Sequence, residues 1–315
     1  MRLLAALILL STLAIYTPVL EAGFVYEDAN WRGQVSAVHQ AGVTRWPGRA
    51  LTQATYAAQD GSSARQFHAV NVLIHLAVGV SVAVLAWRLG VTPVGALIAG
   101  AMFLWHPLNS QAVAYLSARS DLLMTLAIVL AVLVAGTSWH WRVRGLLVLL
   151  LSAAAMQSKE LGLVSLLAVV WTYAPHRGLV VAGLAGTVFL LIWPALSVWL
   201  PFIAWGEWLS LVGAAAAGIW RVVGLAVIPV GLSIDPDPWA VPVVLRAVAV
   251  VALVVSAAWA LRSEGRAAWA WGWVLVALLP RVVVPTYEPV HDHHAYLAMV
   301  GISVWVGSVT EGVFA

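Results

Sequence analysis

The 315-residue chain is 63% hydrophobic and only 9% charged, whereas a soluble domain carries roughly 25% charged residues. This composition argues against a water-soluble fold. The net charge of +3 without any run of Lys or Arg argues against nucleic acid as a partner. The chain has no cysteine, which excludes disulfides, thiolate metal ligands and cysteine nucleophiles.

The first apolar stretch covers residues 3–20 and follows a single basic residue, Arg2. A secretory signal peptide is the alternative interpretation. No clear small-residue cleavage site occurs, and Pro18 and Glu21 stand where one is expected. The sequence therefore predicts a retained transmembrane helix. Residues 21–66 form the longest polar stretch, which we expect to be a first outer loop carrying short helices.

Apolar stretches of membrane-spanning character recur along the rest of the chain. They cover residues 67–87, 93–105, 122–137, 145–156, 161–173, 179–200, 241–261, 267–279 and 296–309. Residues 201–230 are apolar but interrupted by Glu207 and Arg221. They are either a hairpin of two spans or a surface-lying helix with a re-entrant piece. We expect an all-α, polytopic bundle of about 10–12 spans, forming one domain over residues 1–315.

Basic residues fall at alternate span ends, which the positive-inside rule assigns to the cytoplasm. They are Arg2, Arg88, Arg142, Arg144, Arg177, Arg262 and Arg266. The opposite ends carry most of the residues that can do chemistry, provided that 201–230 crosses the membrane an even number of times. We expect an integral protein of the cell inner membrane or its equivalent. Its active face would then point towards the periplasm, the exterior or a lumen.

The acidic pair Glu27 and Asp28 directly follows the first predicted span. Adjacent carboxylates repel, so one of them can serve as a general base near neutral pH. A divalent cation bound by the pair is the alternative, and a solvated turn is the third interpretation. No cofactor is otherwise indicated.

His106 ends one predicted span, and Arg119 and Asp121 open the next. Residues 109–120 are expected to form one amphipathic helix with Gln111, Tyr115 and Arg119 on a single face. Arg119 and Asp121 either pair with each other or line a cavity where Arg119 meets a lipid phosphate.

Lys159 and Glu160 lie between two apolar spans with almost no loop. Charges at such a place are unfavourable unless they face water, a partner or a ligand, and a pair of Lys159 and Glu160 that neutralise each other at the interface is the alternative. Asp292 and His293 belong to a histidine-rich last loop, where a zinc site is an alternative although the spacing matches no familiar zinc motif. His68 and His75, seven residues apart, are interpreted mainly as hydrogen bonders between packed helices.

In collinear order these segments resemble the membrane half of the transmembrane-and-tetratricopeptide-repeat O-mannosyltransferases, which are GT-C glycosyltransferases. The segments are Phe-Val-Tyr-Glu-Asp (24–28), Arg-Ala-Leu-Thr (49–52), Phe-His-Ala-Val-Asn-Val-Leu-Ile-His (67–75), His-Pro-Leu-Asn-Ser-Gln-Ala-Val-Ala (106–114), Ser-Ala-Arg-Ser-Asp-Leu-Leu (117–123), Ser-Lys-Glu (158–160), Leu-Ser-Ile-Asp (232–235) and His-Asp-His-His-Ala-Tyr-Leu (291–297). The chain differs in having Glu-Asp where Asp-Asp is commoner, and in lacking tetratricopeptide repeats within residues 1–315. It also has Asp292-His293-His294-Ala295 before the Tyr-Leu pair, where the family usually carries an acid followed by Arg.

The resemblance implies transfer of a sugar, typically mannose, from a polyprenyl-phosphate carrier to a Ser or Thr hydroxyl, with inversion. An acid of the first outer loop, Glu27 or Asp28, would be the base. The expected donor-binding residues are Arg49, His106, Arg119, Asp121, Lys159, Glu160, Asp292 and His293. The expected partners are the lipid-linked donor, a protein or lipid acceptor and membrane lipids. Glycosylation of a lipid or polymer, or a non-enzymatic transporter or scaffold, are the alternatives.

Overall fold

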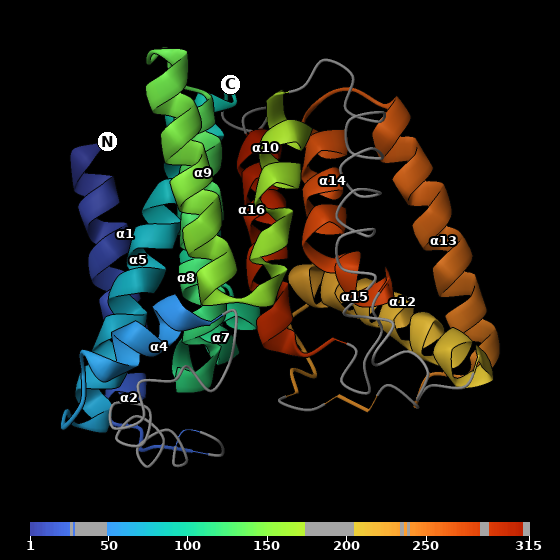
Figure 1. Cartoon of the computed structure of the whole chain (residues 1–315), viewed down its shortest axis with the longest axis horizontal. Coiled ribbons are helices and arrows are strands. Elements are labelled where there is room, and N and C mark those ends of the chain that lie inside the picture. Colours follow the sequence, from blue (N-terminus) through green and yellow to red (C-terminus); the bar gives the residue numbers. More distant parts are fainter. Residues whose placement is uncertain are drawn as a thin grey trace. The chain divides into compact units, whose positions relative to one another are not determined.

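The computed structural model describes residues 1–25, 28, 49–173, 205–233, 236–237, 240–283 and 290–310. Within these ranges all regular structure is helical and no strand occurs, which confirms the all-α prediction. The chain divides into two compact units (Figure 1), here called unit 1 (Met1–Ser165 with Ser303–Ala315) and unit 2 (Leu166–Ile302). The predicted span at 179–200 lies outside the described residues. Assignment of the whole chain to one domain stays a prediction.

Unit 1 consists of long apolar helices with short helices at one end. The long ones are α1 (Arg2–Ile15), α5 (Ala64–Arg88), α6 (Pro93–Trp105), α8 (Arg119–Ala135) and α9 (Trp141–Ser158). Helix α5 packs against α6 and α8, and α8 packs against α9. Helix α4 (Ala50–Ala57) contacts α8 and α9, and α2 (Thr17–Leu20) contacts α5 (Figure 1). The first loop thus supplies a helix that packs on the bundle, as expected.

Unit 2 contains most of α10 (Ser165–Tyr173), α12 (Trp205–Val227), α13 (Val243–Arg262), α14 (Arg266–Leu278), α15 (Pro280–Val283) and the first turns of α16 (Tyr296–Val309). Helix α12 is continuous, so the hairpin interpretation of 201–230 is wrong. Its buried residues Leu211, Ala215, Ile219 and Val222 recur every three or four positions, which defines one packed face. Figure 1 shows α12 lying across the directions of α13 and α14.

Four helical stretches are long and apolar enough to cross a membrane: Ala64–Arg88, Leu116–Ala135, Glu207–Val227 and Val243–Arg262. Three shorter apolar helices, Arg2–Ile15, Pro93–Trp105 and Glu160–Tyr173, accompany them. Large apolar side chains such as Val244, Val251 and Val255 of α13 are exposed, with 62–72% of their surface accessible. Such a surface is unfavourable in water and is compatible with contact to lipid.

The single helix expected over residues 109–120 is wrong. The chain forms a 3-10 turn (Pro107–Asn109), α7 (Ser110–Ala114), an extended Tyr115 (φ −82°, ψ 112°) and a second 3-10 turn (Leu116–Ala118) before α8. In a continuous helix the Ser117 amide would donate to the Val113 carbonyl. Instead that carbonyl accepts from Asn71 and that amide donates to Asp28. Tertiary hydrogen bonds therefore replace the helical one at this point.

Candidate functional site

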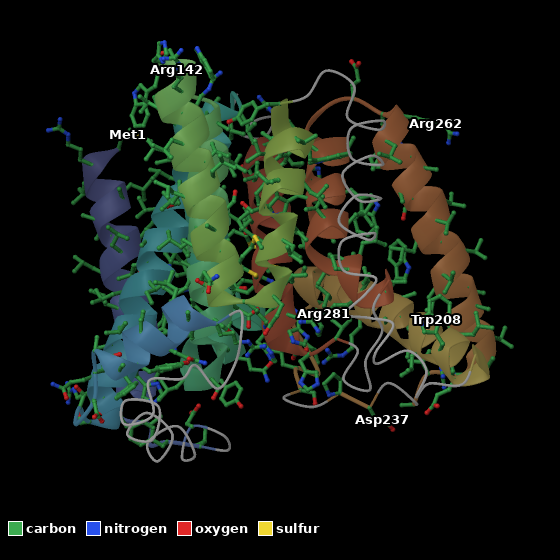
Figure 2. The ribbon with its side chains drawn as sticks, in the orientation of Figure 1. Met1, Arg142, Trp208, Asp237, Arg262 and Arg281 are labelled. Atoms are coloured by element: carbon green, nitrogen blue, oxygen red, sulfur yellow. The ribbon has the colours of Figure 1, made fainter. Side chains whose placement is uncertain are left out.

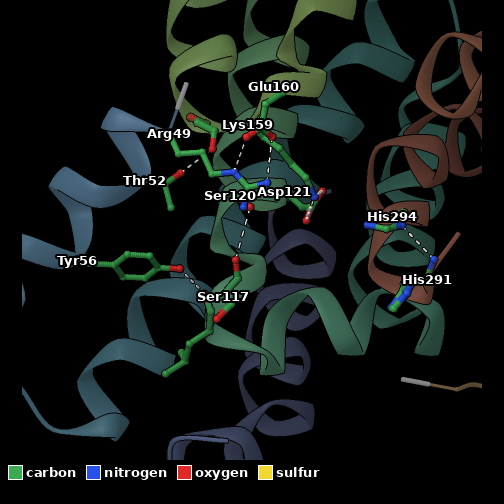
Figure 3. A network of polar contacts seen from close by, with 12 residues as sticks. Arg49, Thr52, Tyr56, Ser117, Ser120, Asp121, Lys159, Glu160, His291 and His294 are labelled. Carbon is green, nitrogen blue, oxygen red and sulfur yellow. Dashed lines mark hydrogen bonds and ion pairs between the residues drawn. The ribbon is translucent and has the colours of Figure 1, made fainter. Parts of the chain in front are cut away.

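Three polar segments that are far apart in the sequence meet at one end of unit 1 (Figure 3). The Thr52 hydroxyl of α4 donates to the Ser158 carbonyl at 2.8 Å. The Tyr56 hydroxyl, one turn further along α4, donates to the Leu116 carbonyl at 2.5 Å. Burial raises the pKa of Tyr56, so this phenol stays protonated and able to donate. Helix α4 thereby fastens the 116–121 segment to the 158–160 segment.

Lys159 and Asp121 form a buried ion pair in this region. The ammonium nitrogen lies 2.7 Å from both carboxylate oxygens, and the two side chains are 8% and 4% exposed. Lys159 has an extended backbone (φ −156°, ψ 147°) directly after the end of α9, and this turns its side chain toward α8. Two of the predicted donor-binding residues are thus brought together as partners.

Arg49 and Glu160 form a second ion pair close by, and this one is open to solvent. Its two hydrogen bonds, from Nε and Nη2 to the two carboxylate oxygens, measure 2.8 and 3.0 Å. Burial alone would raise the pKa of Glu160, but the hydrogen bond and charge of Arg49 outweigh it and lower that pKa. For Arg49, burial acts to lower the pKa, and Glu160 reverses the effect and raises it. Both groups are therefore charged at neutral pH.

Arg119 is fully buried and its guanidinium is bound by neutral acceptors. Nε donates to Asn71 at 2.7 Å, Nη1 to Gln59 at 2.7 Å, and Nη2 to the Phe67 carbonyl at 3.0 Å. The ring of Tyr56 lies 4.6 Å from the guanidinium carbon. Asp121 pairs with Lys159 and not with Arg119, so the expectation of a local Arg119–Asp121 pair is wrong. In this structure Arg119 joins α5 and α8 to the first loop.

Asp28 is 1% exposed and is held by the 116–121 segment. One carboxylate oxygen accepts from the Ser117 amide at 2.9 Å and from the Ser117 hydroxyl at 2.8 Å. This fixes the orientation of the carboxylate next to the buried polar groups. Glu27, the other candidate base, lies outside the described residues.

His106 is buried and its Nδ1 accepts from the Leu108 amide at 3.2 Å, capping the turn that follows α6. His75 contacts the Leu104 carbonyl through Nε2 at 3.1 Å, which agrees with its interpretation as a hydrogen bonder between packed helices. No such hydrogen bond between helices is found for the buried His68 among the described residues. His106 and His75 therefore position the segment that leads into α7 and α8.

The remaining candidates belong to unit 2. Asp292 is 2% exposed, is paired with Arg221 of α12, and accepts from the Ser233 amide at 2.8 Å. The ring of His293 lies 4.1 Å from that of His294. Asp292 therefore joins the last loop to α12 and to the 231–233 turn.

Two residues that hold helices or loops together in the structure, Arg246 and Asn71, were not given this role from the sequence. Arg246 is buried in α13 and donates to the Val241 carbonyl at 2.7 Å and to Ser210 of α12 at 2.8 Å. Its presence within an apolar run was a usable signal, because a charge there is almost always paired. The role of Asn71 carried no comparable signal, since an isolated amide on an apolar helix has many uses.

Within the part of the chain that the structure describes, no group of three or more His, Asp or Glu residues has the arrangement of a metal site. Comparisons with protein-family models, with curated proteins and with solved structures found no match.

Proposed function

We propose that this chain is a membrane glycosyltransferase that moves a sugar, mannose in the first instance, from a polyprenyl-phosphate carrier to an acceptor hydroxyl. The fold in this proposal is a polytopic bundle of the GT-C type. The observation that supports it best is the convergence of an acid, Asp28, with the ion-paired Arg49 and Lys159 at one end of unit 1, where the first loop meets the 116–121 and 158–160 segments. The ordered motif resemblance supplies the reaction class.

In the proposed reaction Glu27 or Asp28 removes the proton of the acceptor hydroxyl. The oxygen then attacks the anomeric carbon, the bond from that carbon to the phosphate oxygen breaks, and the polyprenyl phosphate leaves with its electron pair. Attack from the face opposite the phosphate inverts the configuration. The departing phosphate gains charge, so a cation placed in advance lowers the barrier. Among the described residues, Arg49, Lys159 and Arg119 are the cations at this site.

A binding-only or transport function is the alternative class. A secondary transporter is expected to carry its polar residues near the middle of the membrane, between broken helices. The polar segments of unit 1 instead lie at helix ends, between α4, the start of α8 and the end of α9. This placement favours chemistry at an interface.

Transfer of radiolabelled mannose from polyprenyl-phosphate mannose, measured in proteoliposomes containing the purified chain, tests the proposal. Ser/Thr peptides and lipid extracts are offered as acceptors in separate reactions. Label in the peptide supports protein O-glycosylation, and label in the lipid fraction supports the lipid-directed alternative. Absence of enzyme-dependent label in either fraction, with carrier consumption no faster than in empty liposomes, contradicts a glycosyltransferase.

A further inference from the structure

The two ion pairs of unit 1 differ in how easily their two members can be separated. The Arg49 and Glu160 side chains are 29% and 54% exposed, whereas those of Lys159 and Asp121 are 8% and 4% exposed. An exposed pair contributes roughly 0–1 kcal/mol to stability, and breaking a buried one costs several times more. Separating Glu160 from Arg49 therefore requires little free energy, whereas separating Lys159 from Asp121 requires several times more.

Gln53 marks a missing hydrogen-bonding partner beside Arg49. It lies one turn further along α4, and its backbone amide donates to the Arg49 carbonyl at 3.0 Å. The side chain is 8% exposed, and neither its amide nitrogen nor its amide oxygen has a partner. A buried amide left without partners is unfavourable by about 1–3 kcal/mol. Its presence here points to a polar ligand group that is supplied from outside.

We propose that Arg49 and Gln53 form a phosphate-binding subsite, and that Glu160 occupies it as a stand-in anion until a phosphate displaces it. The planar fork of Arg49 that now holds two carboxylate oxygens fits two phosphate oxygens equally well. Gln53 supplies a hydrogen bond to the same phosphate or to the sugar attached to it. The inference rests on the proposed function, which provides the polyprenyl phosphate as ligand.

The charge balance of the site favours a phosphate that replaces the Glu160 carboxylate over a phosphate that binds in addition to it. Arg49 and Lys159 carry two positive charges, and Asp121 and Glu160 carry two negative ones. The neighbouring Arg119 and Asp28 add one charge of each sign, so the balance is unchanged. An added phosphate would leave the site with net negative charge. Its entry is less unfavourable when Glu160, already half exposed, turns out into solvent. Arg49 and not Lys159 is then the direct ligand of the phosphate.

The test measures dissociation constants of decaprenyl phosphate and, separately, of inorganic phosphate for the purified full chain in detergent. Glu160→Gln removes the competing carboxylate and should tighten binding about two- to fivefold, which corresponds to the strength of an exposed ion pair. Asp60→Asn removes one negative charge from an exposed position of the first loop, which also carries Arg49 and Gln53, and serves as the matched control. It should leave binding unchanged.

Gln53→Leu should weaken binding about two- to tenfold, the value of one hydrogen bond. Its thermal stability should equal or exceed that of the parent, because the unpartnered amide is gone. Loss of stability without loss of binding contradicts a role for Gln53 in the subsite. Binding that is equal or weaker in Glu160→Gln, or equally tightened in Asp60→Asn, contradicts the stand-in role of Glu160.

Tightening for decaprenyl phosphate alone identifies the lipid carrier as the occupant, and tightening for both ligands shows that the phosphate itself is sufficient. A chain that transfers mannose but whose Glu160→Gln variant binds no tighter refutes this inference and leaves the proposed function standing. The converse result, tightened binding without transfer, refutes the proposed function alone.

Discussion

Lys159 and Glu160 are neighbours in the chain, yet their ion pairs have different consequences. The Lys159–Asp121 pair is taken out of solvent, and its two charges depend on each other. The Arg49–Glu160 pair remains partly hydrated, and each of its members can be solvated without the other. The first pair is therefore expected to matter for stability and the second for ligand exchange.

Replacing Lys159 by Met should lower the free energy of unfolding by about 3–5 kcal/mol, because the buried Asp121 carboxylate then loses the ammonium group that lies 2.7 Å from both of its oxygens. The matched change Arg49→Met should cost about 1 kcal/mol or less. Thermal unfolding of the purified variants in one detergent measures both. A Lys159→Met/Asp121→Leu double variant should recover most of the loss. A double variant as unstable as the single one would show that packing, and not the charge, was lost.

The lowered pKa of Glu160 predicts a pH effect of known sign. Its folded-state pKa lies below the ordinary value of 4.5. The stability that the pair contributes is therefore present above pH 4.5 and is lost as the pH falls through the lower folded value. The difference in unfolding temperature between the parent and Glu160→Gln should shrink from pH 6 to pH 3. A difference that stays constant over this range contradicts the ion pair.

For single residues, the sequence predicted which ionisable side chains belong to the candidate site, but it did not predict their ion-pair and hydrogen-bond partners. Lys159 was expected to need a partner, and it has one in Asp121. Arg119 was considered as a phosphate ligand, while the structure surrounds it with neutral acceptors from the first loop and α5. Partner choice depends on which loops pack together, and local spacing carries no information about that.

At the element scale the apolar runs predicted most helices of the described residues, because length and hydropathy are local properties. The break at Tyr115 could not be predicted in this way. It arises where Asp28 and Asn71, both distant in sequence, take the hydrogen-bonding groups of Ser117 and Val113. Helix α12 is likewise continuous because one of its faces is packed, although Glu207 and Arg221 lie within its apolar sequence.

Helices α6 and α16 approach closely at a pair of glycines. A Cβ at Gly307 would lie 2.3 Å from the Gly95 carbonyl oxygen and 2.9 Å from the Ala99 Cβ. Gly307→Ala should therefore destabilise the protein by about 1–3 kcal/mol. The control is Gly145→Ala in α9, where a Cβ meets nothing within 4 Å. It should be neutral or stabilising by up to about 1 kcal/mol. Equal unfolding temperatures for the two variants would contradict the close contact.

At the scale of the whole molecule, the proposed sidedness can be followed along α9. Its 18 residues span about 27 Å, close to the hydrocarbon thickness of a bilayer. Arg142 lies at its first turn (Figure 2), and Lys159 follows its last. The basic end and the site end of this helix are therefore about 27 Å apart, although α9 is not among the four stretches of the described residues that are long and apolar enough to cross a membrane.

Because the chain has no cysteine, single cysteines report the side of each position without background. Cysteines at the exposed positions 60 and 160 should react with an impermeant maleimide from one side of sealed vesicles. Cysteines at positions 142 and 262, also exposed, should react only after the vesicles are opened or inverted. Labelling of positions 60 and 160 from opposite sides would contradict a common active face.

The most direct test of the central claim is mannose transfer by Glu27→Gln and Asp28→Asn variants in the proteoliposome assay, with Asp60→Asn as control. Asparagine at position 28 can still accept the Ser117 hydrogen bonds, so the fold is expected to persist. Loss of the general base should lower the transfer rate about 10²–10⁴-fold in one of the two variants. If both variants transfer as fast as the parent and the control, the proposed catalytic role of this acidic pair is wrong.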